Sequence, residues 1–433
     1  MDRHAELHEG RETARGRRLE RALAETFPDA ADAARSEVEF VRAPGRVNLI
    51  GDHTDYNDGL VLHAAIGLDT WIAVRRRRDG LVRIASLQSP ERAEFWIDEL
   101  EAWGAGGAPP AIGVPRAGRS PRPGWSDHVA GMAWSLNEAA LPVHGFDGVV
   151  DSSIPRGAGL GWVAALELAA ALALLAGERL VAAPVLAALA QRAERDFLGA
   201  NGGIVDPFAG AAGRSGRAIL LDCRSLESRY VAMPAGVIVV VCDTGSPPDA
   251  ANTGEPGATA PAGAPNEAVF LERRAECGRA VALLAQEIPS VASLRDLDTA
   301  TLRRNRHLLS ETVARRAEHV VAENERVVAA AAALGSGDLD ELGRLFAASH
   351  ESLRTLYEVS SPALDAMVEI ARSVPGVVAA RMTGLGFGGC TVNLVRDAAV
   401  AGLERAVATE YPGRTGLTPR VYSVATVDGA GPV

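Results

Sequence analysis

Short apolar runs alternate with polar turns between residues 38 and 98. Runs of this length, bounded by turn-forming residues, predict β-strands. The predicted strands of this region are Glu39–Arg42, Leu60–Ile66, Thr70–Val74 and Leu81–Ile84. Similar runs predict strands later in the chain, at Asp147–Asp151, Ala218–Leu221, Val237–Cys242, Thr391–Val395 and Val421–Val427.

Helical patterns occupy most of the remaining chain. Residues 1–36 interleave Arg with Glu and predict a polar helix, whereas Trp125–Ala140 has apolar residues at helical spacing. An alanine-rich helix is predicted to end near Ala176, with further helices through Phe197. The second half is mostly helical, at Ala268–Gln286, Ser310–Leu334, Leu339–Thr355 and Ser361–Ser373. Because the strands are grouped and do not alternate strictly with helices, the predicted fold class is α+β.

The predicted helix at Ser310–Leu334 carries many charged side chains. We expect them to form a solvated face with some pairing between successive turns; they are Arg315, Arg316, Glu318, His319 and Glu323. His350 is expected at the surface or at a helix cap.

The length of 433 residues exceeds what one hydrophobic core usually supports, so we expect two domains. The predicted division gives an N-terminal domain at 1–215 and a C-terminal domain at 216–433. Two tracts rich in Gly and Pro, Ala105–Pro123 and Thr244–Pro265, are predicted surface loops.

Composition excludes several classes of function. The net charge of -11 argues against nucleic acid or an anionic membrane as the main partner. No apolar run is suited to span a bilayer, and the charged segment Met1–Glu20 does not resemble a secretory signal. The cysteines are dispersed, without metal-binding spacing, which favours reduced thiols and a cytoplasmic location.

The chain has no lysine, so all 44 of its basic residues are arginine. A Walker-type phosphate loop and the protein-kinase strand each need a lysine, and Schiff-base catalysis also needs one. Any phosphate binding must therefore use backbone amides, helix N-termini and arginine.

The densest run of candidate chemistry is residues 44–59. A Pro-Gly turn is followed by Arg46, a short apolar run and three polar residues, Asp52, His53 and Asp55. Short polar side chains of fixed reach suit hydrogen bonds to several hydroxyls of a small polar ligand. The alternative is a polar turn between two strands.

A candidate phosphate loop, Pro-Arg-Gly-Ala-Gly-Leu-Gly at residues 155–161, leads into the alanine-rich helix. Glycines allow the backbone to approach an anion, and the helix N-terminus offers free N–H groups and a favourable dipole. A tight turn before a helix is the alternative explanation for such a segment.

Asp206 is a candidate catalytic carboxylate on a turn that follows Gly202 and Gly203 and is otherwise apolar. Such a carboxylate can accept the proton of an attacking hydroxyl or orient it. Arg46 is its natural partner, because a guanidinium would keep Asp206 ionised and could stabilise charge on a transferring phosphoryl group. The alternative is a purely structural ion pair between the two.

These segments, together with a glycine-rich loop near residue 385, resemble the galactokinases, in the same order from about Glu39 to Val427. Residues 45–59 match G-R-V-N-L-I-G-E-H-T-D-Y-N-D-G except for Asp52 in place of Glu. Residues 380–390 match A-R-M-T-G-A-G-F-G-G-C except for Leu385 in place of Ala. Residues 193–208 resemble A-E-x-x-F-x-G-x-x-C-G-I-M-D-Q-F.

The resemblance implies the two-domain α+β fold of the wider family of galacto-, homoserine, mevalonate and phosphomevalonate (GHMP) kinases, with the active site in the cleft between the domains. It implies ATP and Mg²⁺ as cofactors. The implied reaction is phosphorylation of the anomeric hydroxyl of galactose, or of a modified or longer-chain sugar from a specialised pathway.

The family's functional residues carry over to positions in this chain. The implied catalytic residues are Asp206 and Arg46, and the implied metal ligand is Glu194. The implied sugar contacts are Asp52, His53, Asp55, Gly203, Asp206 and Phe270. The implied ATP contacts are Pro155, Gly157, Ala158, Gly159, Leu160, Gly161 and Trp162.

The sequence departs from the family at two further places. Where the family has P-x-G-x-G-L-S-S-S-A-A, with a serine that helps to bind Mg²⁺ and phosphate, this chain has Gly161, Trp162 and Val163. Phe270 stands where the family has a sugar-binding tyrosine. A catalytically impaired sugar or nucleotide sensor on the kinase scaffold, and a kinase for a non-sugar alcohol, therefore remain alternatives to a sugar 1-kinase. We expect a monomer that acts on small molecules.

Overall fold

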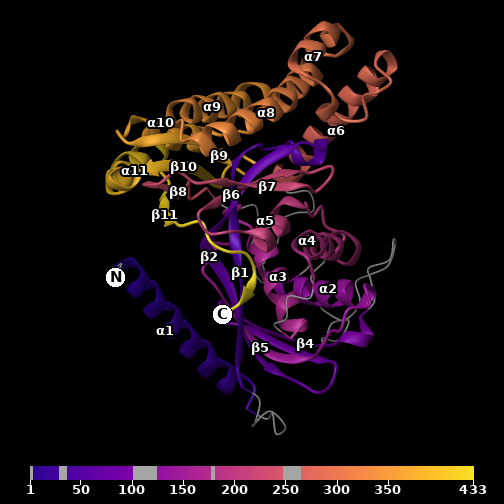
Figure 1. Ribbon diagram of the computed structural model, residues 1–433, viewed down its shortest axis with the longest axis vertical. Coiled ribbons are helices and arrows are strands. Elements are labelled where there is room, and N and C mark those ends of the chain that lie inside the picture. Colours follow the sequence, from indigo (N-terminus) through magenta and orange to yellow (C-terminus); the bar gives the residue numbers. More distant parts are fainter. Residues whose placement is uncertain (1–2, 29–36, 101–123, 177–180, 247–264) are drawn as a thin grey trace.

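The computed structural model describes residues 3–28, 37–100, 124–176, 181–246 and 265–433. It contains two β-sheets with helices packed against them, the larger sheet built mainly from the first half of the chain (Figure 1). The predicted loop at 105–123 and most of the tract at 244–265 lie outside the described residues. Within the described ranges, every helix is too short or too polar to span a bilayer.

The larger sheet is mostly antiparallel. Within the described ranges it has eight strands, ordered β12-β1-β2-β5-β3-β4, with β6 paired to β2 and β7 paired to β6. Only the pairing of β3 with β5 is parallel among these strands. The bounds are β1 (Glu39–Ile50), β2 (Leu60–Arg76), β3 (Leu81–Ser86), β4 (Ser89–Trp96), β5 (Phe146–Ser152), β6 (Arg217–Asp222), β7 (Ser228–Ala232) and β12 (Gly431–Pro432). The α+β class predicted from grouped strands is confirmed.

Helices cover both faces of this sheet. Alternate residues of β2 face opposite sides, so that Ile72 joins the main core and Trp71 joins a smaller cluster under α1 (Arg3–Thr26). Figure 1 shows α1 crossing the sheet on the side away from four other helices. These are α2 (Trp125–Glu138), α3 (Trp162–Leu174), α4 (Ala183–Arg192) and α5 (Val205–Ala212). Helix α3 is almost entirely Ala and Leu and is accordingly buried.

The smaller sheet has the order β11-β8-β10-β9 and is buried on both faces. In β8, Val239 packs into the main core and Val240 packs beneath α10 and α11, which explains its unbroken apolar sequence. The strand bounds are β8 (Val237–Asp243), β9 (Val377–Thr383), β10 (Cys390–Arg396) and β11 (Arg420–Val424). The helices of this half are α6 (Pro265–Glu287), α7 (Thr299–Asn305), α8 (Glu311–Ser336), α9 (Leu339–Ser352), α10 (Pro362–Ser373) and α11 (Val400–Thr415).

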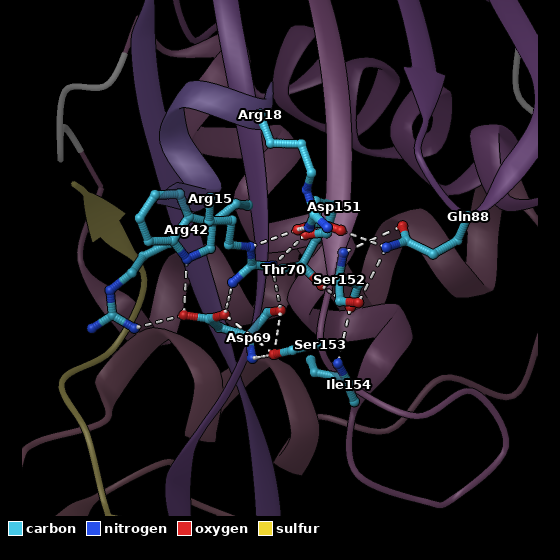
Figure 2. Close-up of polar contacts among 11 residues, drawn as sticks. Arg15, Arg18, Arg42, Asp69, Thr70, Gln88, Asp151, Ser152, Ser153 and Ile154 are labelled. Atoms are coloured by element: carbon cyan, nitrogen blue, oxygen red, sulfur yellow. Dashed lines mark hydrogen bonds and ion pairs between the residues drawn. The ribbon is translucent and has the colours of Figure 1, made fainter. Parts of the chain in front are cut away.

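Helix α1 is fastened to the larger sheet by Arg15 (Figure 2). Its guanidinium contacts the carboxylates of Asp69 at 2.5 Å and Asp151 at 2.7 Å, and it also donates to the backbone carbonyls of both residues. Arg18, on the next turn of α1, reaches Asp151 at 2.5 Å. The network lies where β5 ends, just ahead of the candidate phosphate loop.

Several elements differ from the sequence prediction. The strands predicted at 60–66 and 70–74 form one strand, β2. Among the α-helices and strands of the described residues, seven were not predicted, namely α5, α7, α11, β4, β7, β9 and β12. Strands β6 and β7 follow residue 216 yet pair within the larger sheet. The domain division at 215/216 stays a prediction.

The prediction of a solvated charged face on α8 is wrong for three of its residues. Arg316, His319 and Glu323 are buried, because the chain segments 51–52 and 349–358 pack against this side of the helix. His350 is also buried and lies 3.3 Å from Asp365.

Candidate active site

A cleft of ≈ 370 Å³ brings together the segments that the sequence analysis singled out. Its walls are the sugar loop (residues 51–56), the phosphate loop (155–162), the turn at 201–206 and the glycine loop (384–389). Every residue carried over from the family lines this cleft, including Glu194 and Phe270. Segments from both halves of the chain therefore form one site.

Arg46 and Asp206 form a two-pronged ion pair in the cleft. Arg46 projects from β1, and Asp206 lies in the first turn of α5 rather than on an isolated turn. Arg46 Nε lies 2.7 Å from Asp206 Oδ1 and Nη2 lies 2.7 Å from Oδ2. The side chain of Asp206 keeps 37% of its surface exposed, so a ligand can still reach the carboxylate.

The phosphate loop is held against Arg46. The backbone N–H of Arg46 donates to the carbonyl of Leu160 at 2.9 Å, and its Nη1 donates to the carbonyl of Gly159. The close approach needs Gly45, because a Cβ there would lie 2.6 Å from the Leu160 oxygen. Gly161 has a φ of 76°, which favours glycine.

Trp162 occupies the first position of α3. Its indole is 8% exposed and belongs to the main core, while the Arg156 guanidinium lies 4.5 Å from the ring centroid. The ring therefore does not separate Arg46 from Asp206.

Asp52 joins the sugar loop to the glycine loop. Its Oδ1 accepts from Asn48 Nδ2 at 2.7 Å and from the Gly384 N–H at 3.3 Å. Its Oδ2 pairs with Arg381, a fully buried side chain that also donates to the Leu49 carbonyl. A carboxylate has about four lone-pair sites, so Asp52 can still accept a ligand hydroxyl.

His53 lies in a constrained position beside Asp52. Its φ is 65°, a left-handed conformation that is uncommon outside glycine and is often found at functional sites. Burial lowers the pKa of His53 to about 4, so the ring is neutral at pH 7. Its Nδ1 lies 3.0 Å from the Tyr56 hydroxyl, whereas its Nε2 has no well-aligned hydrogen-bond partner among the described residues.

Asp55 faces the other two carboxylates of the site. Burial raises the pKa of Asp55 to about 6, and the charges of Asp206 and Asp52 add to the increase. Gly203 adjoins it, since a Cβ there would lie 3.7 Å from Asp55 Oδ2.

The C-terminal half supplies supports that the sequence analysis missed. The Gly51 N–H donates to Glu323 at 3.1 Å, and His319 Nε2 lies 3.2 Å from the Asp52 carbonyl. The Leu60 N–H donates to Asn324 at 2.8 Å. The only sequence signal for this supporting role is the spacing of the charged and amide residues of α8, which recur at intervals of one turn.

Glu194 occupies a π-helical turn, Ala193–Phe197, at the phosphate side of the cleft. Burial, and then the charge of Glu167, raise the pKa of Glu194 well above its usual range. Glu167 is fully buried and pairs with His128 Nδ1 at 2.9 Å, and its second oxygen has no hydrogen-bond partner in the part of the chain that the structure describes. Within the described ranges, no cluster of three or more His, Cys, Asp or Glu side chains is arranged to hold a metal.

Three family models match the chain. The galactokinase galactose-binding signature matches residues 25–76, and the N-terminal and C-terminal GHMP kinase models match residues 127–214 and 330–413. A galactokinase of Roseiflexus sp. strain RS-1 is 40% identical over 395 residues, covering 91% of this chain and 93% of the relative. The chain belongs to the galactokinase family. The family implied by the three motifs is thereby confirmed.

Other comparisons agree with this assignment. Human galactokinase is 38% identical over 400 residues, covering 90% of this chain and 91% of the relative. A crystal structure of Lactococcus lactis galactokinase complexed with galactose has a TM-score of 0.80 and 33% identity, and it covers 94% of this chain and 98% of that one. The Methanococcus jannaschii mevalonate kinase has a TM-score of 0.58 at 15% identity, which shows the shared GHMP kinase fold alone.

Proposed function

We propose that this protein is an ATP-dependent sugar 1-kinase that phosphorylates the anomeric hydroxyl of galactose. The observation that carries the proposal is the Arg46–Asp206 ion pair, because it lies where the sugar loop meets the phosphate loop. Phosphoryl transfer depends mainly on positioning and on electrostatic stabilisation, and this pair can supply both.

In the proposed reaction, the carboxylate of Asp206 orients the anomeric hydroxyl and accepts its proton. The sugar oxygen forms a bond to the γ-phosphorus while the bond from phosphorus to the bridging oxygen of ADP breaks. Arg46 keeps Asp206 ionised and stabilises charge on the phosphoryl oxygens. Asp52, His53 and Asp55 bind other sugar hydroxyls, next to Gly203 and the ring of Phe270.

ATP is proposed to bind along the phosphate loop, with backbone N–H groups and the α3 N-terminus facing its phosphates. The contact residues are Pro155, Gly157, Ala158, Gly159, Leu160, Gly161 and Trp162. The chain lacks the family's serines here, so backbone groups replace side-chain oxygens in this proposal.

Glu194 is the proposed ligand for Mg²⁺. Mg²⁺ is usually held by one or two carboxylates together with waters and substrate phosphates, so a single carboxylate that lines the cleft suffices. Burial raises the pKa of Glu194, and the nearby carboxylates of Glu167 and Asp206 add to the increase. This concentration of carboxylates favours a cation at this place. When bound, the ion supplies positive charge for the phosphate oxygens.

A coupled assay of ADP release with galactose tests the proposal. Wild-type protein should turn over, and Asp206→Asn should lose at least about 100-fold in kcat. Asp79→Asn is the matched control, because Asp79 makes a similar two-pronged pair with Arg77 and neither residue lines the cleft. Galactose binding without turnover would favour a sensor and overturn the proposal.

The size of the sugar substrate, the oligomeric state and the cellular location are also part of the proposal. A panel of galactose derivatives in the same assay would reveal whether Asp52 and Phe270 admit a modified or longer-chain sugar. We also propose that the protein is a monomer and that it is cytoplasmic; the four free cysteines support the location.

A further inference from the structure

A chain of polar side chains runs from the sugar loop into the C-terminal half. The hydroxyl of Tyr56 lies 3.0 Å from His53 Nδ1 and 2.6 Å from the hydroxyl of Tyr357. The Tyr357 hydroxyl in turn lies 3.3 Å from the Cys277 sulfur. Tyr357 and Cys277 are at most 1% exposed, so water does not compete for these groups.

Tyr357 is presented by an unusual backbone feature. It ends a π-helical turn, Leu353–Tyr357, and Glu358 follows with a φ of 57°. Single π turns are frequently associated with functional sites. The ring of Tyr357 lies between two histidines, with centroids 4.7 Å from His53 and 4.5 Å from His319. This arrangement fixes the Tyr357 hydroxyl beside Tyr56.

We propose that Tyr56, backed by Tyr357, is a positioning residue that fixes the tautomer of His53 so that Nε2–H is available to a sugar hydroxyl oxygen. A neutral imidazole has one donor nitrogen and one acceptor nitrogen, and the hydrogen bond at one nitrogen decides the role of the other. The proposal rests on the proposed sugar kinase function.

The direction of the hydrogen bonds follows from the groups involved. A phenol O–H is a good donor, whereas its oxygen is a weak acceptor because its lone pair is shared with the ring. An imidazole nitrogen is a strong acceptor. The Tyr56 O–H therefore donates to His53 Nδ1, and the Tyr56 oxygen accepts from the Tyr357 O–H. The proton-bearing Nε2 is the nitrogen of His53 that lacks a well-aligned hydrogen bond within the described residues, although a backbone contact with Leu385 partly offsets the lowering of the pKa of His53 by burial.

A buried N–H without a partner is unfavourable, and His53 lines the cleft. A ligand hydroxyl would accept the hydrogen bond of Nε2–H. In this proposal the strained backbone of His53 serves to hold that donor where the sugar binds. Asp52 and Asp55 can only accept hydrogen bonds when ionised. His53 thus adds a donor to a set of acceptors, and the loop can discriminate hydroxyls by the direction of their hydrogen bonds.

The tautomer can be measured directly by ¹⁵N NMR of histidine-labelled protein at pH 7, without turnover. We expect His53 to show a protonated Nε2 and an unprotonated Nδ1 in the wild type. Tyr56→Phe should give a mixture of tautomers, raise the KM for galactose about tenfold, and leave the KM for ATP within about twofold. Tyr357→Phe should move both readouts in the same direction by a smaller amount.

Tyr230→Phe is the matched control, since the exposed Tyr230 of β7 donates its hydroxyl to the Ala212 carbonyl and does not line the cleft; it should change neither readout. A wild-type His53 protonated at Nδ1 would overturn the inference, even if the variants failed to fold. An unchanged galactose KM in a folded Tyr56→Phe protein would also overturn it. Absence of galactose turnover in the wild type would refute the proposed function instead, because the tautomer is measured independently.

Discussion

The guanidinium of Arg46 meets the carboxylate of Asp206 with two parallel contacts of 2.7 Å, and the same guanidinium donates to the carbonyl of Gly159. One side chain thus links the candidate base to the phosphate loop. This geometry needs the planar fork of arginine, which places several donors in fixed directions.

Arg46→Lys should therefore behave as a severe substitution. An ammonium can contact Asp206 or Gly159 but cannot reproduce the fork, so we expect kcat to fall at least about 100-fold. The KM for galactose should change much less. Steady-state kinetics with both substrates varied would check this, and Arg77→Lys provides the control at the comparable pair with Asp79.

The pKa of Asp55, raised to about 6 by burial and by its acidic neighbours, predicts a pH effect on sugar binding. Protonated Asp55 loses acceptor capacity, so the KM for galactose should rise as the pH falls below 6. Asp55→Asn should abolish that dependence and have a high KM throughout. A KM profile that stays flat between pH 7 and pH 5 in the wild type would contradict this role.

The same pKa predicts an opposite effect on stability. A raised pKa in the folded state means that folding favours the protonated form, so the contribution of Asp55 to stability is present at low pH and is lost as the pH rises from about 4 to about 6. Asp55→Asn should then stabilise the protein at pH 7 by about 1–2 kcal/mol but not near pH 3.5. Urea unfolding at the two pH values measures the difference.

The segments that line the cleft could be named from the sequence because each of them is short. Arg46, near the end of β1, and Asp52, His53 and Asp55 of the sugar loop lie close together in the sequence, and their order restricts which side chains can reach a common ligand. Asp206 was predicted to be a functional residue on a turn, whereas the structure places it in the first turn of helix α5. Pro207, the third residue of α5, is compatible with the first turn of a helix.

The supports of the site could not be predicted because they depend on contacts between distant parts of the chain. His319 and Glu323 have the spacing of an exposed helix face, yet they are buried against the backbone of the sugar loop. The local pattern of α8, with charged and amide residues one turn apart, is compatible with both an exposed face and a buried support. Tyr357 was missed for the same reason, because its partner Tyr56 lies 301 positions earlier in the chain.

We expect serine to be tolerated at position 163 but not at position 161, both of which are serine in the family. Gly161 has a φ of 76°, and a Cβ there would lie 3.2 Å from Arg46 Cγ. Gly161→Ser should therefore destabilise the protein by about 1–3 kcal/mol and lower kcat. Val163→Ser lies in the first turn of α3 at the cleft and should leave kcat and the affinity for Mg²⁺-ATP unchanged or improved. Isothermal titration with Mg²⁺-ATP compares the two variants, and equal behaviour would contradict the backbone argument.

Arg15 should be a major contributor to stability although it lies far from the cleft along the sequence. Its removal leaves Asp69, 13% exposed, with only the more distant Arg42 at 3.7 Å, and Asp151, 5% exposed, with only Arg18 as a positive partner among the described residues (Figure 2). Arg15→Met should cost about 3–5 kcal/mol. Arg18→Met, at a side chain that is 62% exposed, should cost no more than about 1 kcal/mol. Urea denaturation separates the outcomes, and similar losses in both variants would argue against the buried network.

The most direct test of the account is the identity of the product. Protein, ATP, Mg²⁺ and galactose should be incubated and followed by ³¹P NMR with detection of the coupling to sugar protons. The account predicts a new phosphate monoester coupled to the anomeric proton, formed by the wild type and Asp79→Asn but at least about 100-fold more slowly by Asp206→Asn. A phosphoryl group on another sugar carbon, or equal rates in all three proteins, would contradict the role of the Arg46–Asp206 pair.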